Sequence, residues 1–271
     1  MGFFIRVEPD VKIFVEDLNP EGSNTILFIH GWPGNHKLFE YQFNMLPKLG
    51  FRCIGIDYRG FGQSDKPWHG YGYDRLSDDV RCVIDTLKLK DIALLGHSTG
   101  GGIAVRYMAR HGGHGIAKLA LCAAAAPSLV KRSYFPYGLP RQDVIDIIRH
   151  TYTDRPQMLR DFGKMIFYKP VSQAMSDWIF HLGLQAAGWS TVSIAETWLD
   201  EEGLFSDLAQ ISVPTLIMQG IHDRVVLPAL SEVQHNSIKN SMLVPFKESG
   251  HFLFIDQKEM FTDELARFAG D

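Results

Sequence analysis

Ile92-Ala-Leu-Leu-Gly-His-Ser98-Thr-Gly-Gly-Gly102 is the stretch of sequence that decides the fold. Its first four residues are apolar and predict a buried strand, and the helical period that begins near Thr99 predicts a helix. Between them stands Gly96-His-Ser98-Thr-Gly100, the G-x-S-x-G pattern of a sharp strand-to-helix turn. Such a turn lifts the serine out of the sheet, and glycine leaves room where a Cβ would clash. Ser98 is therefore the candidate nucleophile.

Similar apolar runs recur along the chain, and segments with the period of an α-helix separate them. Such runs suit strands buried on both faces, as in a parallel sheet covered by helices. The alternating residues 2–18 predict a further pair of strands. We therefore predict an α/β fold with a mostly parallel, eight-stranded sheet flanked by helices, and with its ligand site at the strand ends. The predicted buried strands are 25–30, 52–57, 92–96, 118–122, 215–218 and 241–245, and the clearest helices are 36–48, 75–88, 99–111 and 252–269.

The alternation of strand and helix stops between residues 127 and 205. This stretch is rich in proline and aromatic residues, and 141–150 and 172–187 have helical periodicity. A helical insertion between two core strands is expected to form a cap over the sheet edge; a separate small domain is the alternative. We divide the chain into a core, 1–126 and 206–271, and a helical cap, 127–205.

Two later strand ends provide the partners that a serine nucleophile needs. A serine hydroxyl attacks well only when a nearby base takes its proton, and histidine is the usual base at neutral pH. His251 follows the last predicted strand. Asp223 follows the preceding one and would orient the imidazole and stabilise its charged form. We predict Ser98, Asp223 and His251 as a catalytic triad; an ordinary turn aspartate is the alternative for Asp223.

The tetrahedral intermediate of acyl transfer carries a negative oxygen that fixed backbone N–H groups must stabilise. The N–H of Thr99, at the start of the helix after the serine, is one expected donor. The N–H of Trp32 is the other, because His30-Gly-Trp-Pro33 follows a strand of the same predicted sheet. Pro33 has a fixed φ and can hold this loop rigid. An ordinary tight turn is the alternative for the loop.

The composition excludes several classes of protein. Hydrophobic residues make up 45% of the chain, and the net charge is −4 with no basic stripe of the kind that binds nucleic acid. No apolar run approaches the roughly 18 residues of a membrane span, and residues 1–14 lack the pattern of a signal peptide. Cys53, Cys82 and Cys122 have no metal-site spacing. We expect a reduced, cytoplasmic protein without a bound metal.

Five motifs carry a resemblance to a known family. They are His30-Gly-Trp-Pro33, Asp57-Tyr-Arg-Gly-Phe-Gly-Gln-Ser-Asp65, Gly96-His-Ser-Thr-Gly-Gly-Gly102, Arg106-Tyr-Met-Ala-Arg-His111 and Tyr137-Gly-Leu-Pro140. With the chain order Ser, Asp, His, they resemble the α/β-hydrolase superfamily, and within it the cofactor-free haloperoxidase, aryl esterase and γ-lactamase group. The resemblance runs from about residue 11 to 268. It implies the same triad and oxyanion donors, and no cofactor.

The triad and the resemblance together predict hydrolysis of a small carboxylic ester, lactone or amide through an acyl-serine intermediate. The aromatic residues of the predicted cap indicate a compact apolar acyl or aryl group. The residues expected to contact the substrate are Trp32, Phe135, Tyr137, Trp189 and Val225. Many relatives have Phe and Met beside the nucleophile where this chain has His97 and Thr99, so their substrate preference does not carry over.

Other functions remain compatible with the same residues. The triad could support perhydrolysis, in which a peracid forms and oxidises halide, or the hydrolysis of a carbon–carbon bond. A small-molecule receptor that retains the triad is a third alternative. Epoxide hydrolases and haloalkane dehalogenases need a carboxylate nucleophile, and Ser98 argues against both. We expect no nucleic-acid or membrane partner, and the sequence leaves the natural substrate and the oligomeric state open.

Overall fold

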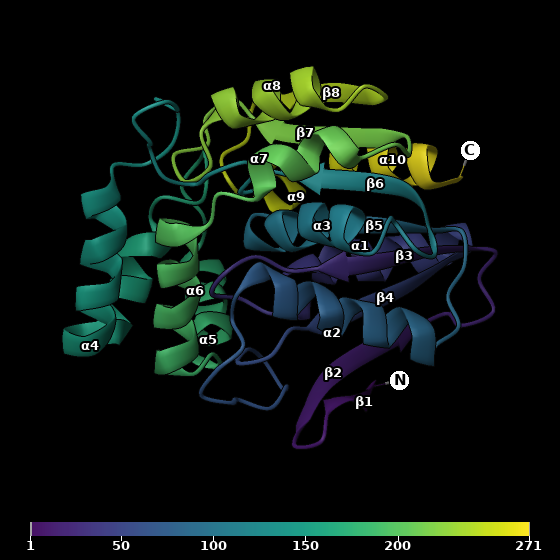
Figure 1. The fold of residues 1–271 in the computed structure, drawn as a ribbon, viewed down its shortest axis with the longest axis horizontal. Coiled ribbons are helices and arrows are strands. Elements are labelled where there is room, and N and C mark those ends of the chain that lie inside the picture. Colours follow the sequence, from purple (N-terminus) through teal and green to yellow (C-terminus); the bar gives the residue numbers. More distant parts are fainter. Residues whose placement is uncertain (1, 271) are drawn as a thin grey trace.

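A single eight-stranded sheet with helices on both faces forms the body of the protein (Figure 1), for which a computed structural model describes residues 2–270. The strand order is β1-β2-β4-β3-β5-β6-β7-β8. The β1–β2 and β2–β4 pairs are antiparallel, and the other neighbouring pairs are parallel. The predicted α/β fold is thus confirmed. The strands are β1 (Gly2–Glu8), β2 (Val11–Leu18), β3 (Asn24–Ile29), β4 (Phe51–Asp57), β5 (Ile92–His97), β6 (Ile116–Cys122), β7 (Thr215–Gly220) and β8 (Ser241–Phe246).

The strand order reverses direction at β3. The chain places β4 on one side of β3 and then returns to place β5 on the other side. Loops that leave the carboxyl ends of two such neighbouring strands diverge to opposite faces, which leaves a crevice between them where ligands bind in α/β proteins. The turn that carries Ser98 follows β5, and the loop that carries Trp32 follows β3. The topology therefore brings these two segments together.

The helices cover the sheet and extend beyond its edge. Figure 1 shows α4, α5 and α6 grouped beyond the ends of the strands, away from the helices that flank the sheet. The helical elements are η1 (His36–Phe39), α1 (Glu40–Met45), η2 (Leu46–Leu49), α2 (Tyr73–Thr86), α3 (Thr99–Arg110), α4 (Arg141–Gly163), α5 (Gln173–Leu184), α6 (Gly188–Asp200), α7 (Leu204–Asp207), η3 (Leu208–Gln210), α8 (Pro228–Ser237), α9 (Leu253–Asp256) and α10 (Lys258–Gly270).

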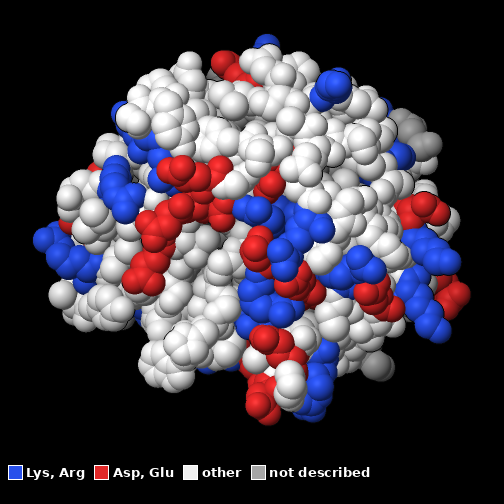
Figure 2. All heavy atoms as spheres, in the orientation of Figure 1, with Lys and Arg blue, Asp and Glu red and all other residues white. Residues whose placement is uncertain are grey.

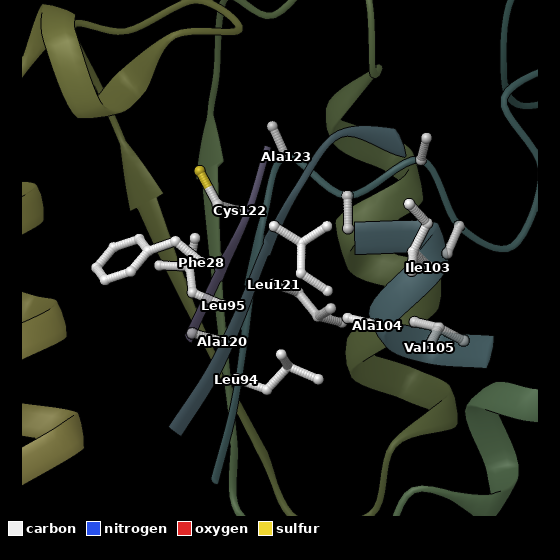
Figure 3. Close-up of a cluster of buried hydrophobic side chains, with 14 of the residues drawn as sticks. Phe28, Leu94, Leu95, Ile103, Ala104, Val105, Ala120, Leu121, Cys122 and Ala123 are labelled. Atoms are coloured by element: carbon white, nitrogen blue, oxygen red, sulfur yellow. The ribbon is translucent and has the colours of Figure 1, made fainter. Parts of the chain in front are cut away.

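The centre of the sheet is buried on both faces. All six residues of β5 are buried, as the continuous apolar run predicts. Successive side chains of a strand point to opposite faces, and Figure 3 shows Leu94 and Leu121 on the side of α3, with Leu95 and Phe28 on the other side. Burial of each such side chain contributes about 1.5–3 kcal/mol. This core holds the carboxyl end of β5 in place.

Several helices differ from their predicted extent. The segment 36–48 is divided into η1, α1 and η2, and 252–269 is divided into α9 and α10. The helix predicted at 141–150 continues to Gly163 as α4, with non-helical φ and ψ at Asp154. Pro156 explains this kink, because proline lacks an N–H and its ring clashes with the preceding turn. The helices α6 and α8 were not predicted, since α6 contains β-branched residues that disfavour an isolated helix.

The charged surface consists largely of paired groups. Figure 2 shows Lys and Arg atoms beside Asp and Glu atoms across the middle of the face in view. Arg106 of α3, for example, lies 2.6 Å from Glu201 and 3.1 Å from Asp207, which connects the core to the chain segment that follows α6. Ion pairs of this partly exposed kind contribute about 0–1 kcal/mol each. They set the orientation of segments more than the stability of the fold.

Candidate active site

Ser98 stands on the turn between β5 and α3, and its backbone is strained. It has φ 53° and ψ −120°, a conformation that a residue with a side chain adopts only where its surroundings enforce it. Gly100 is part of these surroundings, since an added Cβ there would lie 2.3 Å from the carbonyl oxygen of Ile29. The Ser98 carbonyl accepts hydrogen bonds from the N–H groups of Gly101 and Ala125, both at 2.9 Å. The turn thus fixes Ser98 at the carboxyl end of β5.

His251 and Asp223 lie side by side, fully buried, after β8 and β7. His251 Nδ1 is 2.8 Å from Asp223 Oδ2, and Nε2 has no hydrogen-bond partner among residues 2–270. Asp223 Oδ1 accepts the N–H groups of Val225 and Val226 at 2.8 and 2.9 Å, and Gln219 Nε2 donates to Oδ2 at 3.2 Å. A carboxylate held in this way fixes the proton on Nδ1 and leaves Nε2 able to accept one.

His97, directly before Ser98, connects the turn to His251. The two histidine ring centroids are 4.7 Å apart, and His97 Nε2 lies 3.2 Å from the His251 carbonyl oxygen. Burial, and then the neighbouring His251, lower the pKa of His97 well below its usual value, so its ring is neutral. Because a carbonyl only accepts, Nε2 carries the proton and donates it. This contact places His251 against the residue that directly precedes the candidate nucleophile.

The two expected oxyanion donors come from adjacent loops. β3 and β5 pair directly in the sheet, so the loop after β3 reaches the turn after β5. An added Cβ at Gly31 would lie 2.9 Å from the Cβ of Ser98, which shows how closely the two segments approach. Trp32 and Thr99 are both buried, and within the described chain neither backbone N–H donates to another backbone group. Both N–H groups are available to a substrate oxygen.

A largely apolar cavity of about 310 Å³ opens beside Ser98, a size suited to a small organic molecule. Three aromatic rings form part of its wall: Trp32 contacts Phe162 and Trp198 edge-to-face, each with centroids 5.1 Å apart. The side chains lining the cavity are Trp32, Ser98, Leu129, Leu139, Asp143, Asp146, Ile147, His150, Met158, Asp161, Phe162, Met165, Trp198 and Val225.

Two of the five residues expected to contact the substrate line this cavity, and three lie elsewhere. Trp32 and Val225 are part of the lining, whereas Phe135, Tyr137 and Trp189 are not. Phe135 and Tyr137 contact each other with ring centroids 5.4 Å apart. Trp189 donates its indole N–H to a carbonyl of the loop before α2, at 3.0 Å. These three rings thus lie outside the lining of this cavity, and their contact with the substrate stays a prediction.

The sequence did not single out the residues that form much of the wall. Met158 and Phe162 are four residues apart and share one face of the second half of α4. This spacing is visible in the sequence, but the helix predicted there ended at residue 150, before both residues. Trp198 lies on α6, a helix that was not predicted. Aromatic content identified the segment, whereas only helix packing determined which side chains face the cavity.

Other chemistries have little support in the described residues. No group of three or more His, Cys, Asp or Glu side chains within 2–270 could hold a metal ion. The three cysteines are unpaired, and burial raises the pKa of the Cys53 thiol to about 12 and that of Cys122 well above its usual value. A buried thiol of this kind is a poor nucleophile. Across the same residues, none of the helices combines the length and apolar character needed to span a bilayer.

Comparison with known proteins agrees with this geometry. The family model described as alpha/beta hydrolase fold matches residues 24–142. The AB hydrolase superfamily protein YisY of Bacillus subtilis is 47% identical over 99% of both chains. The non-heme haloperoxidase of Rhodococcus erythropolis is 33% identical over 98% of both chains. Among solved structures, the esterase EaEST from Exiguobacterium antarcticum matches 100% of both chains with a TM-score of 0.97 and 41% identity. The chain is therefore an enzyme of the α/β-hydrolase superfamily and belongs, within it, to the haloperoxidase and esterase group.

Proposed function

We propose that this enzyme hydrolyses small carboxylic esters, lactones or amides through an acyl-Ser98 intermediate. The observation that carries the proposal is the hydrogen-bonded pair of His251 and Asp223, together with a strained Ser98 that lines an apolar cavity. The relative from Exiguobacterium antarcticum, named an esterase, supports the choice of an ester as substrate. A base with a free Nε2 and a carboxylate partner is what serine-based acyl transfer requires.

In the first half-reaction, Ser98 Oγ attacks the substrate carbonyl carbon while His251 Nε2 takes the hydroxyl proton. Asp223 keeps its negative charge and stabilises the imidazolium. The carbonyl oxygen becomes an oxyanion, which accepts hydrogen bonds from the N–H groups of Trp32 and Thr99. When the carbonyl re-forms, the bond to the alcohol or amine breaks, and the leaving group takes the proton from His251.

In the second half-reaction, water attacks the acyl carbon as His251 Nε2 takes one of its protons. Collapse of this intermediate releases the carboxylic acid and returns the proton to Ser98 Oγ. We assign residues 127–205 as the cap that shields these steps from bulk water, because α4 and α6 supply much of the cavity wall. The core is then 1–126 and 206–271, of which residues 1 and 271 lie outside the described chain.

The Ser98→Ala variant tests the proposal. We expect it to lose cleavage of p-nitrophenyl acetate and labelling by a fluorophosphonate probe, and to unfold in urea like the wild type. Ser206→Ala, at an exposed serine of α7, is the matched control and should keep both. Full esterase activity in Ser98→Ala would refute the mechanism. Labelling of the wild type without turnover of a broad panel of esters, lactones and amides would instead favour a receptor.

Perhydrolysis is a second candidate, favoured by the relative named a non-heme haloperoxidase. Acetate would acylate Ser98 with loss of water, and hydrogen peroxide in place of water would then release peracetic acid, which oxidises bromide. We expect peroxide-dependent bromination in acetate buffer that disappears in Ser98→Ala. Bromination that persists in that variant would place the activity outside the triad.

We also propose a cytoplasmic location. All three cysteines are unpaired, including the partly exposed Cys82, as expected in a reducing compartment. A fusion of the chain to a fluorescent protein, followed by cell fractionation, tests this directly.

A further inference from the structure

The bent helix α4 faces the catalytic cavity along both of its halves. Before the kink at Asp154, the cavity-lining residues Asp143, Ile147 and His150 are spaced by four and three residues, so they share one helical face. After the kink, Asp161 and the apolar residues around it line the same cavity. The kink therefore turns two short helical faces toward the cavity that Ser98 also lines; we call the part lined by Asp143, Asp146 and Asp161 its acidic opening.

The charges that these two faces contribute are negative. Asp143, Asp146 and Asp161 line the cavity, and among its described lining residues there is no Lys or Arg. Asp143 has no ion-pair partner within residues 2–270. Asp146 is 3.1 Å from Arg149 and Asp161 is 2.7 Å from Lys164. These two pairs are exposed at the surface, where ion pairs are weak, and Asp143 adds a negative charge that no described cation pairs.

Three aromatic rings line the same cavity as the candidate nucleophile. Trp32, Trp198 and Phe162 form an edge-to-face cluster there. Aromatic ring faces attract cations, and quaternary ammonium groups in particular. A carboxylate in the same place would lose hydration without gaining a cationic partner, which is costly. The aromatic wall and the acidic opening thus both favour a cationic substrate over an anionic one.

We propose that this cavity selects its substrates by charge, admitting esters whose outer end is neutral or cationic and excluding those that carry a carboxylate there. This inference rests on the proposed function and names the class of ester that the same site takes. The three aspartates of the opening, Asp143, Asp146 and Asp161, act as specificity-determining residues. They take no part in the chemistry at Ser98, so their removal changes the ratio of kcat/KM between cationic and anionic esters.

The test uses three p-nitrophenyl esters with acyl chains of equal length that end in tert-butyl, trimethylammonium or carboxylate. The first two have the same shape and differ only in charge. At pH 8, above the titration range of an exposed imidazole, and at an ionic strength of about 0.01 M, we expect kcat/KM for the cationic ester to exceed that for the anionic ester at least about tenfold. Added salt of about 0.5 M should shrink this ratio several-fold, because it screens exposed charges.

The variant D143N/D146N/D161N assigns the effect to the opening. We expect its cation-to-anion ratio of kcat/KM to fall below about three. Because the ratio compares two substrates on one enzyme, a general change of activity in the variant does not affect it. The matched control is D10N/E232Q/D263N, which removes three exposed acids outside the cavity lining and should keep the wild-type ratio.

A wild-type ratio near or below one would overturn the proposal, as would an unchanged ratio in D143N/D146N/D161N. The tert-butyl ester tests the proposed function separately: if the wild type does not hydrolyse it, or Ser98→Ala still does, the esterase assignment fails whatever the charge preference.

Discussion

Replacement of Asp223 by asparagine should nearly abolish catalysis, because it moves the imidazole proton of His251 from Nδ1 to Nε2. The N–H groups of Val225 and Val226 donate to Asp223 Oδ1 at 2.8 and 2.9 Å, so the amide oxygen of an asparagine must occupy that place. Its NH2 group then faces His251 Nδ1, 2.8 Å from the present Oδ2. A nitrogen that faces a donor must accept, so the imidazole proton moves to Nε2. In the proposed mechanism, Nε2 is the atom that accepts the proton of Ser98.

We expect kcat of Asp223→Asn to fall about 10⁴-fold, the size known for the equivalent change in serine proteases, or about 5.5 kcal/mol of transition-state stabilisation. Stability should change by only about 1–3 kcal/mol, because the asparagine keeps both backbone hydrogen bonds. The assay is steady-state release of p-nitrophenolate, with urea unfolding to establish that the variant is folded. Asp263→Asn, an exposed aspartate of α10, controls for the loss of one charge. A folded Asp223→Asn enzyme with activity within tenfold of wild type would refute the assigned role.

Three further predictions follow from the same geometry. Gly100→Ala should lower the free energy of unfolding in urea by about 2–3 kcal/mol, because its Cβ would lie 2.3 Å from the carbonyl oxygen of Ile29; an unchanged unfolding midpoint would contradict this close approach. His97→Phe should reduce kcat for p-nitrophenyl acetate about tenfold, because it removes the donor that holds the His251 carbonyl, and an unchanged kcat would show that this bond does not position the base. Burial lowers the pKa of His30 from 6.5 to about 4. As the pH falls, the imidazole is therefore protonated in the unfolded chain before it is protonated in the folded chain, and the free energy of unfolding decreases below pH 6.5. Between pH 6.5 and pH 5 this loss of stability is about 2 kcal/mol. Urea titrations of His30→Gln should lack this loss, and an equal pH dependence of stability in both proteins would rule out the role of His30.

The sequence predicted the sheet well because each strand is defined by its own residues. The apolar run at 92–96 is long enough to identify a buried strand without knowledge of its neighbours, and the observed β5 coincides with it. The turn around Ser98 is equally local, since its glycines are required by contacts within a few residues of the serine and with the adjacent strand. The helices were less predictable. The helix predicted at 141–150 is shorter than α4, because packing of the second half of α4 continues the helix beyond Pro156.

The residues that line the cavity were the least predictable part of the candidate site. Phe135, Tyr137 and Trp189 are aromatic, like several residues that line the cavity, yet they lie outside its lining and contact other parts of the chain. Which face of a helix meets a cavity depends on how that helix packs against segments far away in the sequence. No local pattern contains this information, because hydrophobic side chains serve a cavity wall and a protein core equally well.

The sequence by itself determined the hydrolase fold and the edge of the sheet where the candidate site lies. Ser98, Asp223 and His251 each follow a strand with a clear hydrophobic pattern, and the carboxyl ends of parallel strands lie at one edge. Only the tertiary structure decided the partners of these groups: the bond from His97 to a carbonyl 154 residues away, and the placement of the α4 aspartates at the cavity. The physical reason is that strand identity depends on local hydrophobicity, whereas these contacts depend on the relative placement of elements that the chain brings together only when it folds.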